Sequence, residues 1–339
     1  MSADDYDREG VLLNQAATAV WPEGIIQVKV PLPFSLKWVN SYLVPGQQGY
    51  TLIDPGLHTP DAVLAWNAAL KAHEIAYEQI HTIMLTHQHP DHYGLAGWFQ
   101  QRTAAPVLMS EQSHAYAVRL WGNDDSFSLE LTDLYARHGM PAEVLNAIAP
   151  HLAAFRERVS PQPEITYISA GDMLQMGNRS WLAIDAPGHA RGQLCLYDSA
   201  ERRMFCGDQV LPDITPNVSV VPREDGDPLQ QFLDSLVHLR SYEVELAFPG
   251  HRDPFTRFDD RAAELLLHHE RRLAQIASLL EAEPCSGYDL CQRLFGARIS
   301  GNTHNLRFAM SETLAHLFHL ENRGQIHSRT RNGMIIFTS

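Results

Sequence analysis

The sequence predicts an α/β protein with a large first domain, residues 1–260, and a smaller second domain, residues 261–339. Two observations support this division. Short apolar runs alternate with segments of helical spacing as far as about residue 250, an order of elements that places helices over the faces of a sheet. The balance of charge then changes, because residues 1–260 carry 17 basic and 33 acidic side chains, whereas residues 261–339 carry nine and seven.

The large domain is expected to begin with a meander of short strands. The apolar runs GIIQVKVPLP, SYLVPG and YTLIDPG are separated by Pro and Gly residues that favour turns. A helix is then predicted from Thr59, which suits the N-cap, with Pro60 in the first turn. Val63, Leu64 and Leu70 recur at helical spacing and are expected on its buried face. IHTIMLTH and PVLMS are typical of buried strands, and a helix is expected to begin in GLAGWFQQR between them.

Residues 110–161 interrupt this alternation and are predicted to form a helical insertion. Their large apolar side chains are expected to pack within the insertion, and the alternative is a lid over a binding site. These side chains are Trp121, Phe127, Tyr135, Met140 and Phe155. Strands are expected to resume in EITYIS, RSWLAIDAPGH, GQLCLYDS and RRMFCGD, followed by a helix in PLQQFLDSLVHLRS and a strand in VELAFPGH.

The second domain is predicted to contain three helices and a hairpin. RAAELLLHHERRLAQIASLLEAE is a long helical run, and SGYDLCQRLFG and NLRFAMSETLAHLFHLENRG follow it. QIHSRTRNGMIIFTS is typical of a hairpin that turns at Asn332-Gly333, a favoured two-residue turn. This order of elements is that of a winged-helix domain.

Composition excludes several classes of partner. The formal net charge of −14 disfavours binding to nucleic acid and to membrane surfaces, which need positive charge. The sequence contains no run of about 20 apolar residues, so no membrane span is predicted. The stretch MSADDYDREG lacks the basic and apolar regions of a secretory signal. The four cysteines, Cys195, Cys206, Cys285 and Cys291, show no CxxC spacing, so we expect reduced thiols and a cytoplasmic location.

Four polar clusters each follow a predicted strand and are candidates for metal binding. In three of them a glycine stands immediately before the candidate ligand and allows a tight turn or a close backbone approach. The clusters are His87-x-His89-x-Asp91-His92, APGH with His189, FCGD with Asp208 and FPGH with His251. Histidines elsewhere, His58, His114, His138 and His151, are expected to be solvated.

Imidazole and carboxylate ligands together suit zinc or a neighbouring first-row ion. Alternate residues of an extended stretch point the same way, so His87 and His89 can hold one ion. Asp91 and His92, at the turn into the next helix, can hold a second ion. Two such ions about 3.5–4 Å apart can trap and ionise one water. His189 and His251 would complete the two sites, and Asp208 can bridge them.

The segments LIDPG, THQHPDHYGLAG, APGHARGQ, FCGDQVLPDITPNV and FPGHRDP occur in this order between about residues 25 and 255. In these segments the chain resembles the metallo-β-lactamase superfamily, in its glyoxalase-II-like branch of binuclear hydrolases. The C-terminal part is similar to the winged-helix appendage of one subgroup of these hydrolases.

The resemblance implies a four-layer αββα sandwich with two divalent metal ions at one edge, zinc first, with iron or manganese as alternatives. It places His87, His89 and His189 on one ion. It places Asp91, His92 and His251 on the other, with Asp208 between the two. It also implies that Asp54 of LIDPG supports the ligands without binding metal.

The chain departs from the family pattern at two positions. Zinc β-lactamases of the commonest type carry a cysteine where this chain has Asp208, and Cys206 lies only two residues earlier. The glycine before Asp208 favours the aspartate as the ligand, so an antibiotic-hydrolysing role is disfavoured. Arg252 stands where many relatives have a second glycine, and its consequence is open.

The leading functional hypothesis is hydrolysis of an activated acyl bond, a thioester or lactone, by a metal-bridging hydroxide. Asp91 would orient the water and pass on its proton. The alternatives are an endoribonuclease or phosphodiesterase, a mononuclear iron persulfide dioxygenase, and a ligand sensor whose winged helix contacts DNA. The expected partner is a small acyl substrate, with nucleic acid and membrane disfavoured and a homodimer through the appendage as a further possibility.

Overall fold

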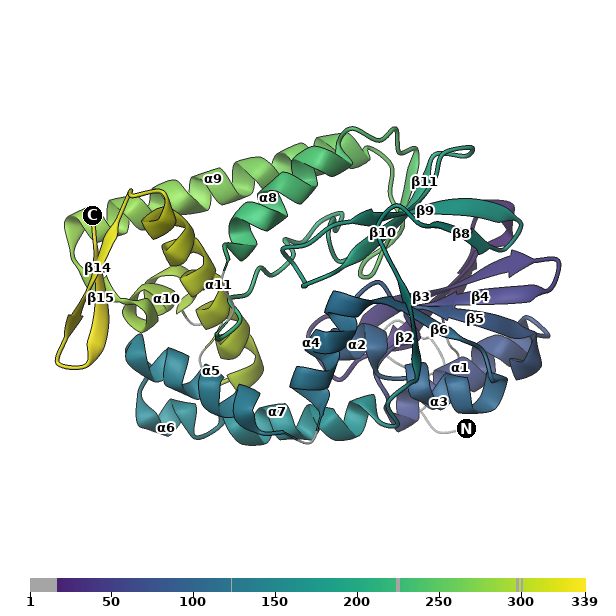
Figure 1. The fold of residues 1–339 in the computed structure, drawn as a ribbon, viewed down its shortest axis with the longest axis horizontal. Coiled ribbons are helices and arrows are strands. Elements are labelled where there is room, and N and C mark those ends of the chain that lie inside the picture. The colour runs from purple at the N-terminus through teal and green to yellow at the C-terminus, as the bar shows by residue number, and fades with distance from the viewer. Residues whose placement is uncertain (1–16, 123, 224–225, 297–298, 300) are drawn as a thin grey trace, which may run out of the picture.

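The computed structural model describes residues 17–122, 124–223, 226–296, 299 and 301–339. The stretch MSADDYDREG, where a secretory signal is not expected, lies outside these residues. Figure 1 shows two sheets at one end of the molecule and a group of helices at the other.

The first sheet has seven strands in the order β1-β2-β3-β4-β5-β6-β7. Strands β1 to β4 pair antiparallel, as the predicted meander requires, and β4 to β7 pair parallel. The strands are β1 (Ala17–Val20), β2 (Ile26–Pro31), β3 (Trp38–Gly46), β4 (Gly49–Ile53), β5 (Ile80–Met84), β6 (Val107–Ser110) and β7 (Ile165–Ile168).

The second sheet has five strands in the order β12-β11-β10-β9-β8. It is also mixed, because β11 and β12 are parallel and the other neighbours are antiparallel. The strands are β8 (Met173–Met176), β9 (Arg179–Asp185), β10 (Leu194–Asp198), β11 (Arg203–Gly207) and β12 (Leu246–Pro249). The short strands β1 and β8 were not predicted.

The two sheets pack face to face through one apolar core. Tyr42 and Met84 of the first sheet lie in the same buried cluster as Trp181, Phe205 and Phe248 of the second. The ring of Tyr42 lies 5.2 Å from that of Phe205, centroid to centroid. This packing brings the ends of β5, β9, β11 and β12 together, which is where the candidate ligands follow.

Helices cover the outer faces of both sheets. On the first sheet these are α1 (Pro60–Ala72), α2 (Pro90–Tyr93) and α3 (Ala96–Thr103), with the short 3₁₀ helices η2 (Pro22–Gly24) and η3 (Tyr77–Gln79) in the connections. On the second sheet they are α8 (Pro228–Leu239) and α9 (Phe258–Ala282).

The predicted buried face of α1 is partly wrong. Thr59 caps the helix by accepting a hydrogen bond from the Ala62 amide, and Pro60 lies in the first turn, as expected. Leu64, however, is 56% exposed, whereas Trp66 is fully buried. Two residues correspond to about 200° on a helix, so Leu64 and Trp66 lie on opposite sides. Leu70 is buried as predicted, and it forms the face that contacts the sheet together with Trp66 and three alanines.

The predicted insertion is helical. It comprises α4 (Glu111–Trp121), α5 (Ser126–Arg137), α6 (Ala142–Leu145), α7 (Ile148–Arg156) and the 3₁₀ helix η4 (Glu157–Val159). Phe127, Tyr135 and Met140 share a buried cluster with residues of the C-terminal helices. The Tyr135 hydroxyl donates a hydrogen bond of 2.9 Å to the carbonyl oxygen of Arg307. The insertion therefore packs against the C-terminal part of the chain, and α5 and α7 lie beside α11 (Figure 1).

The C-terminal part contains the predicted helices and hairpin, with a short extra strand β13 that completes a three-stranded sheet. Asn332 and Gly333 adopt φ values of 51° and 80°, which confirms the turn. Beyond α9 the elements are β13 (Cys285–Ser286), α10 (Gly287–Phe295), α11 (Thr303–Asn322), β14 (His327–Arg331) and β15 (Met334–Thr338). His138, expected in solvent, is instead buried, with its ring 5.5 Å from that of Phe318. The reason is that α5 packs on the C-terminal helices.

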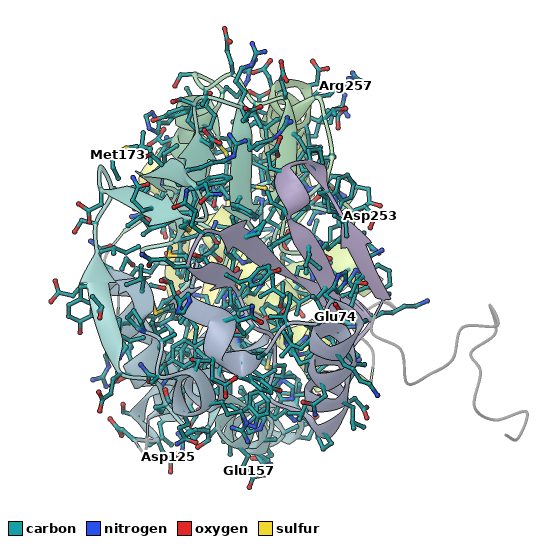
Figure 2. The ribbon with its side chains drawn as sticks, turned by 90° about the vertical axis from the view of Figure 1, so that its right-hand side faces the viewer. Glu74, Asp125, Glu157, Met173, Asp253 and Arg257 are labelled. Atoms are coloured by element: carbon teal, nitrogen blue, oxygen red, sulfur yellow. The ribbon has the colours of Figure 1, made fainter. Side chains whose placement is uncertain are left out.

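Acidic side chains lie on several sides of the surface, in keeping with the negative net charge. Glu74, Asp125 and Glu157 are exposed and project outward (Figure 2). Within the part of the chain that the structure describes, no helix is both long and apolar enough to cross a membrane.

Candidate metal centre

The predicted ligands converge at the ends of strands from both sheets. His87 and His89 follow β5, and Asp91 and His92 lie on α2. The remaining three come from the turns after β9, β11 and β12, and they are His189, Asp208 and His251. The structure therefore brings together all seven residues, although 164 positions separate the first from the last.

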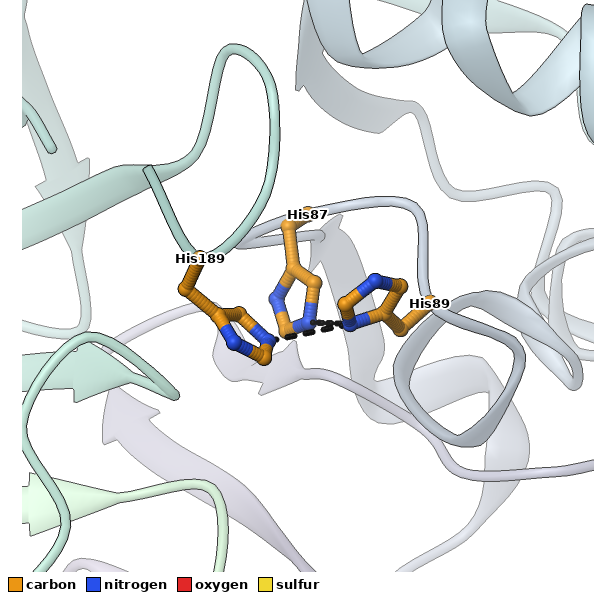
Figure 3. A group of neighbouring side chains, drawn as sticks. All are labelled: His87, His89 and His189. Atoms are coloured by element: carbon orange, nitrogen blue, oxygen red, sulfur yellow. Dashed lines mark hydrogen bonds between the residues drawn. The ribbon is translucent and has the colours of Figure 1, made fainter. Parts of the chain in front are cut away.

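His87, His89 and His189 form the three-histidine cluster (Figure 3). His87 Nε2 lies 3.1 Å and His189 Nε2 lies 3.0 Å from His89 Nδ1. The other nitrogens of two rings are held by the protein. His189 Nδ1 donates to the carbonyl oxygen of Asn217 at 2.7 Å. This bond fixes the tautomer in which Nδ1 of His189 carries the proton and Nε2 carries a free lone pair.

The tautomer of His87 follows from its neighbours. The Thr86 hydroxyl has one hydrogen and donates it to Asp54 Oδ2 at 2.6 Å. It must therefore accept the hydrogen bond of 2.9 Å from His87 Nδ1, which leaves Nε2 of His87 without a proton. Burial lowers the pKa of His87 well below its usual value and that of His89 to about 3, so both rings are neutral. The converging lone pairs suit a cation.

Asp91, His92 and His251 form the mixed cluster. His251 Nε2 lies 3.2 Å from Asp91 Oδ2 and 3.3 Å from Asp208 Oδ2. Asp208 also lies between the two clusters, since Oδ1 is 3.4 Å from His92 Nε2 and Oδ2 is 3.6 Å from His189 Nε2. One carboxylate thus faces both clusters.

The pKa shifts in the mixed cluster are opposite to those in the three-histidine cluster. Burial alone would lower the pKa of His251, but the carboxylates of Asp208 and Asp91 outweigh it and raise this pKa to about 10. The pKa of His92 is raised for the same reason. The pKa of Asp91 is depressed despite its burial, because His92 and His251 favour the carboxylate. The protons on His92 and His251 therefore balance the negative charge of the two carboxylates, a role that a divalent ion would take over.

Asp54 supports this arrangement from behind. Its Oδ1 accepts the Thr86 amide at 2.8 Å, and Oδ2 accepts His92 Nδ1 at 2.9 Å as well as the Thr86 hydroxyl. Because its oxygens already accept these hydrogen bonds, Asp54 orients His92 and is poorly placed to bind an ion itself. Such carboxylate–histidine pairs are typical of metal sites.

Two further observations show that the residues fit divalent ions. His92 Nε2 and Asp208 Oδ1 are buried, and neither has a hydrogen-bond partner among the described residues. Buried polar atoms usually have one, so each has a free coordination position. A Cβ at position 250 would lie 2.2 Å from Asp208 Oδ1 and 2.5 Å from His92 Cε1, so only glycine fits. Nitrogen and carboxylate donors together suit zinc and its first-row neighbours.

Replacing Gly250 by alanine should lower the affinity for metal about 10-fold to 100-fold, because the added methyl displaces Asp208 and His92. Metal content after gel filtration measures the effect, and circular dichroism checks folding. Gly324→Ala is the control for a glycine-to-alanine change away from the ligands, since nothing lies within 4 Å of its Cβ position. Its φ of 66° strains an alanine and can lower stability, but the metal content per folded chain should stay at the wild-type value. Wild-type metal affinity in Gly250→Ala would contradict the assignment of these two ligands.

Residues 39–251 match the family described as the metallo-beta-lactamase superfamily. The chain belongs to this superfamily. Residues 273–339 match a second family, described as the metallo-beta-lactamase-like C-terminal domain.

Individual metallo-beta-lactamase relatives resemble the chain over different lengths. The probable metallo-hydrolase YqjP of Bacillus subtilis (strain 168) is 28% identical over 93% of this chain and 98% of its own length. The acyl-coenzyme A thioesterase MBLAC2 of Homo sapiens is 27% identical over 56% of this chain and 64% of its own length. Among solved structures, the metallo-beta-lactamase family protein TTHA1429 of Thermus thermophilus has a TM-score of 0.84 and 32% identity. That comparison covers 94% of this chain and 99% of the other.

In this member of the superfamily, Asp208 faces the clusters and Cys206 does not. Cys206 is fully buried, and its Sγ lies 3.3 Å from the carbonyl oxygen of Val210, directed away from the ligands. Burial raises the pKa of this thiol well above its usual value. The aspartate rather than the cysteine is therefore placed to bind metal.

Two asparagines that the sequence did not point to hold the ligand-bearing loops. Asn40 Nδ2, in the middle of β3, donates to the carbonyl oxygens of Pro249 and Arg252 on either side of His251. Asn217 orients His189, and its own Nδ2 donates to Glu312 Oε2 of α11 at 2.9 Å. A buried asparagine within an apolar strand is the one signal that could have indicated Asn40.

A cavity of about 400 Å³ opens onto the ligands. His89, Asp91, His189, Asp208 and His251 form one side of it. The other walls come from four separate stretches: Phe34–Leu36 after β2, Trp121 and Phe155 of the insertion, Leu211 and residues 214–217 after β11, and Phe295, Ile299, His304, Asn305, Arg307, Phe308, Ala309 and Glu312 of the C-terminal part. Phe127, Tyr135 and Met140 of the insertion pack in the core, in keeping with the expected role in packing. Trp121 and Phe155 line the cavity, in keeping with the alternative of a lid over a binding site.

Proposed function

We propose that this member of the metallo-beta-lactamase superfamily is a binuclear metal-dependent hydrolase of the glyoxalase-II-like branch. It would cleave an activated acyl bond, a thioester or a lactone. The observation that carries the proposal is the position of Asp91, which belongs to the mixed cluster and also lines the cavity. A carboxylate at this point can serve both a bound ion and a substrate. The human relative MBLAC2 is described as an acyl-coenzyme A thioesterase, which supports an acyl compound as the substrate.

His87, His89 and His189 would hold one ion, and Asp91, His92 and His251 the other, with Asp208 shared. Two ions, zinc by preference, would lower the pKa of a water to about 7, which makes it a nucleophile at neutral pH. They would also polarise the acyl oxygen. Asp91 is ionised, since His92 and His251 depress its pKa, and can accept the proton of the attacking water. The same carboxyl can then donate this proton to the departing thiolate or alkoxide.

The walls of the cavity favour a small, partly apolar acyl compound over a polynucleotide. Trp121 and Phe155 of the insertion and Phe308 of α11 enclose the space in front of the ligands. An endoribonuclease would also need positive charge around the site, and residues 1–260, which supply all the ligands, have 33 acidic and 17 basic side chains.

The finer architecture belongs to the same proposal. A large hydrolase domain would end near residue 260 and carry the insertion at about 110–161, and residues 261–339 would form a winged-helix-like domain. The order α9, α10, α11 and then the hairpin β14–β15 supports the second assignment. The packing of helices on both outer faces of the paired sheets supports a four-layer αββα sandwich.

A substrate panel with the metal-loaded protein tests the function. Acyl-coenzyme A thioesters, an acylglutathione and lactones should be hydrolysed, whereas RNA and a persulfide should not react. Metal analysis should return about two ions per chain, and a single iron with persulfide oxidation would instead establish the dioxygenase alternative. Hydrolysis of RNA alone would overturn the proposal in favour of the nuclease.

Replacing Asp91 by asparagine should lower kcat by roughly 10²-fold to 10⁴-fold, because the amide cannot accept the proton. The amide oxygen still offers a weak ligand, so metal analysis of the same sample separates loss of proton transfer from loss of an ion. Asp61→Asn, which changes an exposed carboxylate on α1 that does not line the cavity, is the matched control and should leave kcat unchanged. Full activity in Asp91→Asn would remove Asp91 from the mechanism.

A further inference from the structure

The cavity wall formed by α11 carries a cation that pairs with no carboxylate among the described residues. Arg307, on α11, lines the cavity. Its Nε is buried without a hydrogen-bond partner among the described residues. Burial lowers the pKa of Arg307, and the groups that act against this effect are two tyrosines, Tyr135 and Tyr116, rather than a described carboxylate. The guanidinium nevertheless stays protonated, as arginine does in proteins.

Several other partly buried arginines among the described residues have a carboxylate partner. Arg119 pairs with Glu130, Arg203 lies 3.5 Å from Glu23, and Arg272 lies 3.7 Å from Glu312. A buried charge without a partner is costly, so such a group usually meets a ligand. Arg307 differs from these arginines in facing a cavity that can admit one.

A second buried nitrogen without a hydrogen-bond partner among the described residues is Nδ1 of His304, one helical turn before Arg307 on the same wall. Its ring stacks on that of Phe34, with centroids 4.7 Å apart and planes inclined by 5°. Burial and the nearby charge of Arg307 lower the pKa of His304 to about 4, so the ring is neutral and offers one N–H.

Aromatic side chains surround these two polar groups. The guanidinium carbon of Arg307 lies 4.2 Å from the ring centre of Phe308, and Phe155 and Phe34 lie on the other side of His304. This wall therefore combines the positive charge of Arg307 with apolar surface. The carboxylate of Glu312 also lines the cavity, but it accepts a hydrogen bond from Asn217 and lies 3.7 Å from Arg272. Arginine pairs with the two oxygens of a carboxylate or a phosphate through its forked N–H groups.

We infer that Arg307 and His304 form a subsite for the anionic end of the substrate, a carboxylate or phosphate joined through an apolar segment to the acyl group that the metal ligands face. This inference rests on the proposed function for the identity of the reacting group, but the anion site itself does not. In a chain of net charge −14 the subsite makes one wall of the cavity selective for anions.

Binding of a matched pair of probes tests the subsite without any turnover. The probes are 4-phenylbutyrate and its neutral isostere 4-phenylbutanamide, titrated by calorimetry into the metal-loaded protein. The acid should bind at least about 10-fold more tightly than the amide. In Arg307→Met, which keeps the length of the side chain over Phe308, the acid should weaken by roughly 10-fold to 100-fold. The amide should change less than about twofold.

Arg158→Met is the matched control, because Arg158 also approaches the ring of Phe155, at 5.8 Å, but does not line the cavity. It should leave the binding of both probes unchanged. If circular dichroism shows that Arg307→Met does not fold, His304→Phe replaces it. That ring keeps the stacking on Phe34, and the acid alone should weaken several-fold. Equal losses for acid and amide, or no loss for either, would overturn the inference.

Two substrate pairs distinguish the source of the anion. In the first, a glutaryl thioester of N-acetylcysteamine is compared with the pentanoyl thioester, which places the carboxylate on the acyl side. In the second, phosphopantetheine and pantetheine thioesters of one acyl chain are compared, which places a phosphate on the leaving group. Arg307→Met should raise KM for the anionic member of one pair and leave kcat for its neutral partner unchanged.

If the wild-type protein hydrolyses neither pair yet binds the acid through Arg307, the proposed function fails and the subsite stands. If it hydrolyses both pairs and Arg307→Met changes no KM, the subsite fails and the proposed function stands.

Discussion

Replacing Asp208 by alanine should remove metal from the protein and lower kcat/KM by roughly three orders of magnitude, which corresponds to the loss of several kcal/mol of charge stabilisation. The reason is that one carboxylate faces both clusters, with Oδ1 3.4 Å from His92 and Oδ2 3.3 Å from His251 and 3.6 Å from His189. Metal content by mass spectrometry and kcat/KM on the best thioester measure the two effects.

Cys206→Ala is the control for this variant. Cys206 lies in β11, two residues before Asp208, and both side chains are buried, but its thiol faces Val210 and not the clusters. It should keep two ions per chain and most of the activity. If instead Asp208→Ala retains metal and activity while Cys206→Ala loses them, the cysteine is the ligand and the site resembles that of the zinc β-lactamases.

The two ions should respond differently to pH. In the mixed cluster, nearby carboxylates raise the pKa of His251 to about 10, so this ring carries a proton at every pH below that value and must lose it to bind metal. The affinity of this cluster should therefore rise about tenfold per pH unit for each displaced proton between pH 6 and pH 9. In the three-histidine cluster, burial lowers the pKa of His89 to about 3 and also lowers that of His87, so no proton is displaced in this range.

Chelator competition at pH 6, 7, 8 and 9 measures both affinities. We expect one nearly constant value and one that rises steeply with pH, so that acidification releases the ion of the mixed cluster first. Parallel slopes for the two ions would contradict the protonation states assigned to the clusters. Asp91→Asn provides an internal check, since loss of this carboxylate lowers the pKa of His251 and should flatten the steep dependence.

The convergence of the candidate metal ligands could be predicted from sequence because each cluster lies a few residues after an apolar strand. A strand places the residue after it at the edge of the sheet, so His189, Asp208 and His251 were recognisable once His87 and His89 indicated a metal. Asp54, expected to support the ligands, hydrogen-bonds His92 as this role requires. Local sequence carried this information, and the fold only had to bring the strand ends together.

Other features depend on contacts between distant segments and left no local signal. Leu64 and Trp66 both fit an apolar face, and only the packing of α1 on the sheet decided which is buried. His138 is buried because α5 meets the C-terminal helices. Arg307 stands in a polar stretch of the sequence that resembles any helix start, and its relation to the ligands follows from the placement of α11 beside the cavity.

Because α11 supplies one wall of the cavity while every metal ligand precedes residue 252, the chemistry and the selectivity of this enzyme are encoded in separate stretches of the gene. Substitutions at His304 or Arg307 can alter which compound is accepted without disturbing the ions. Glu312 sets the limit to this freedom, since it holds Asn217, whose carbonyl orients His189. One helix therefore carries the proposed anion subsite near its start and, farther along, a carboxylate on which the orientation of a candidate metal ligand depends.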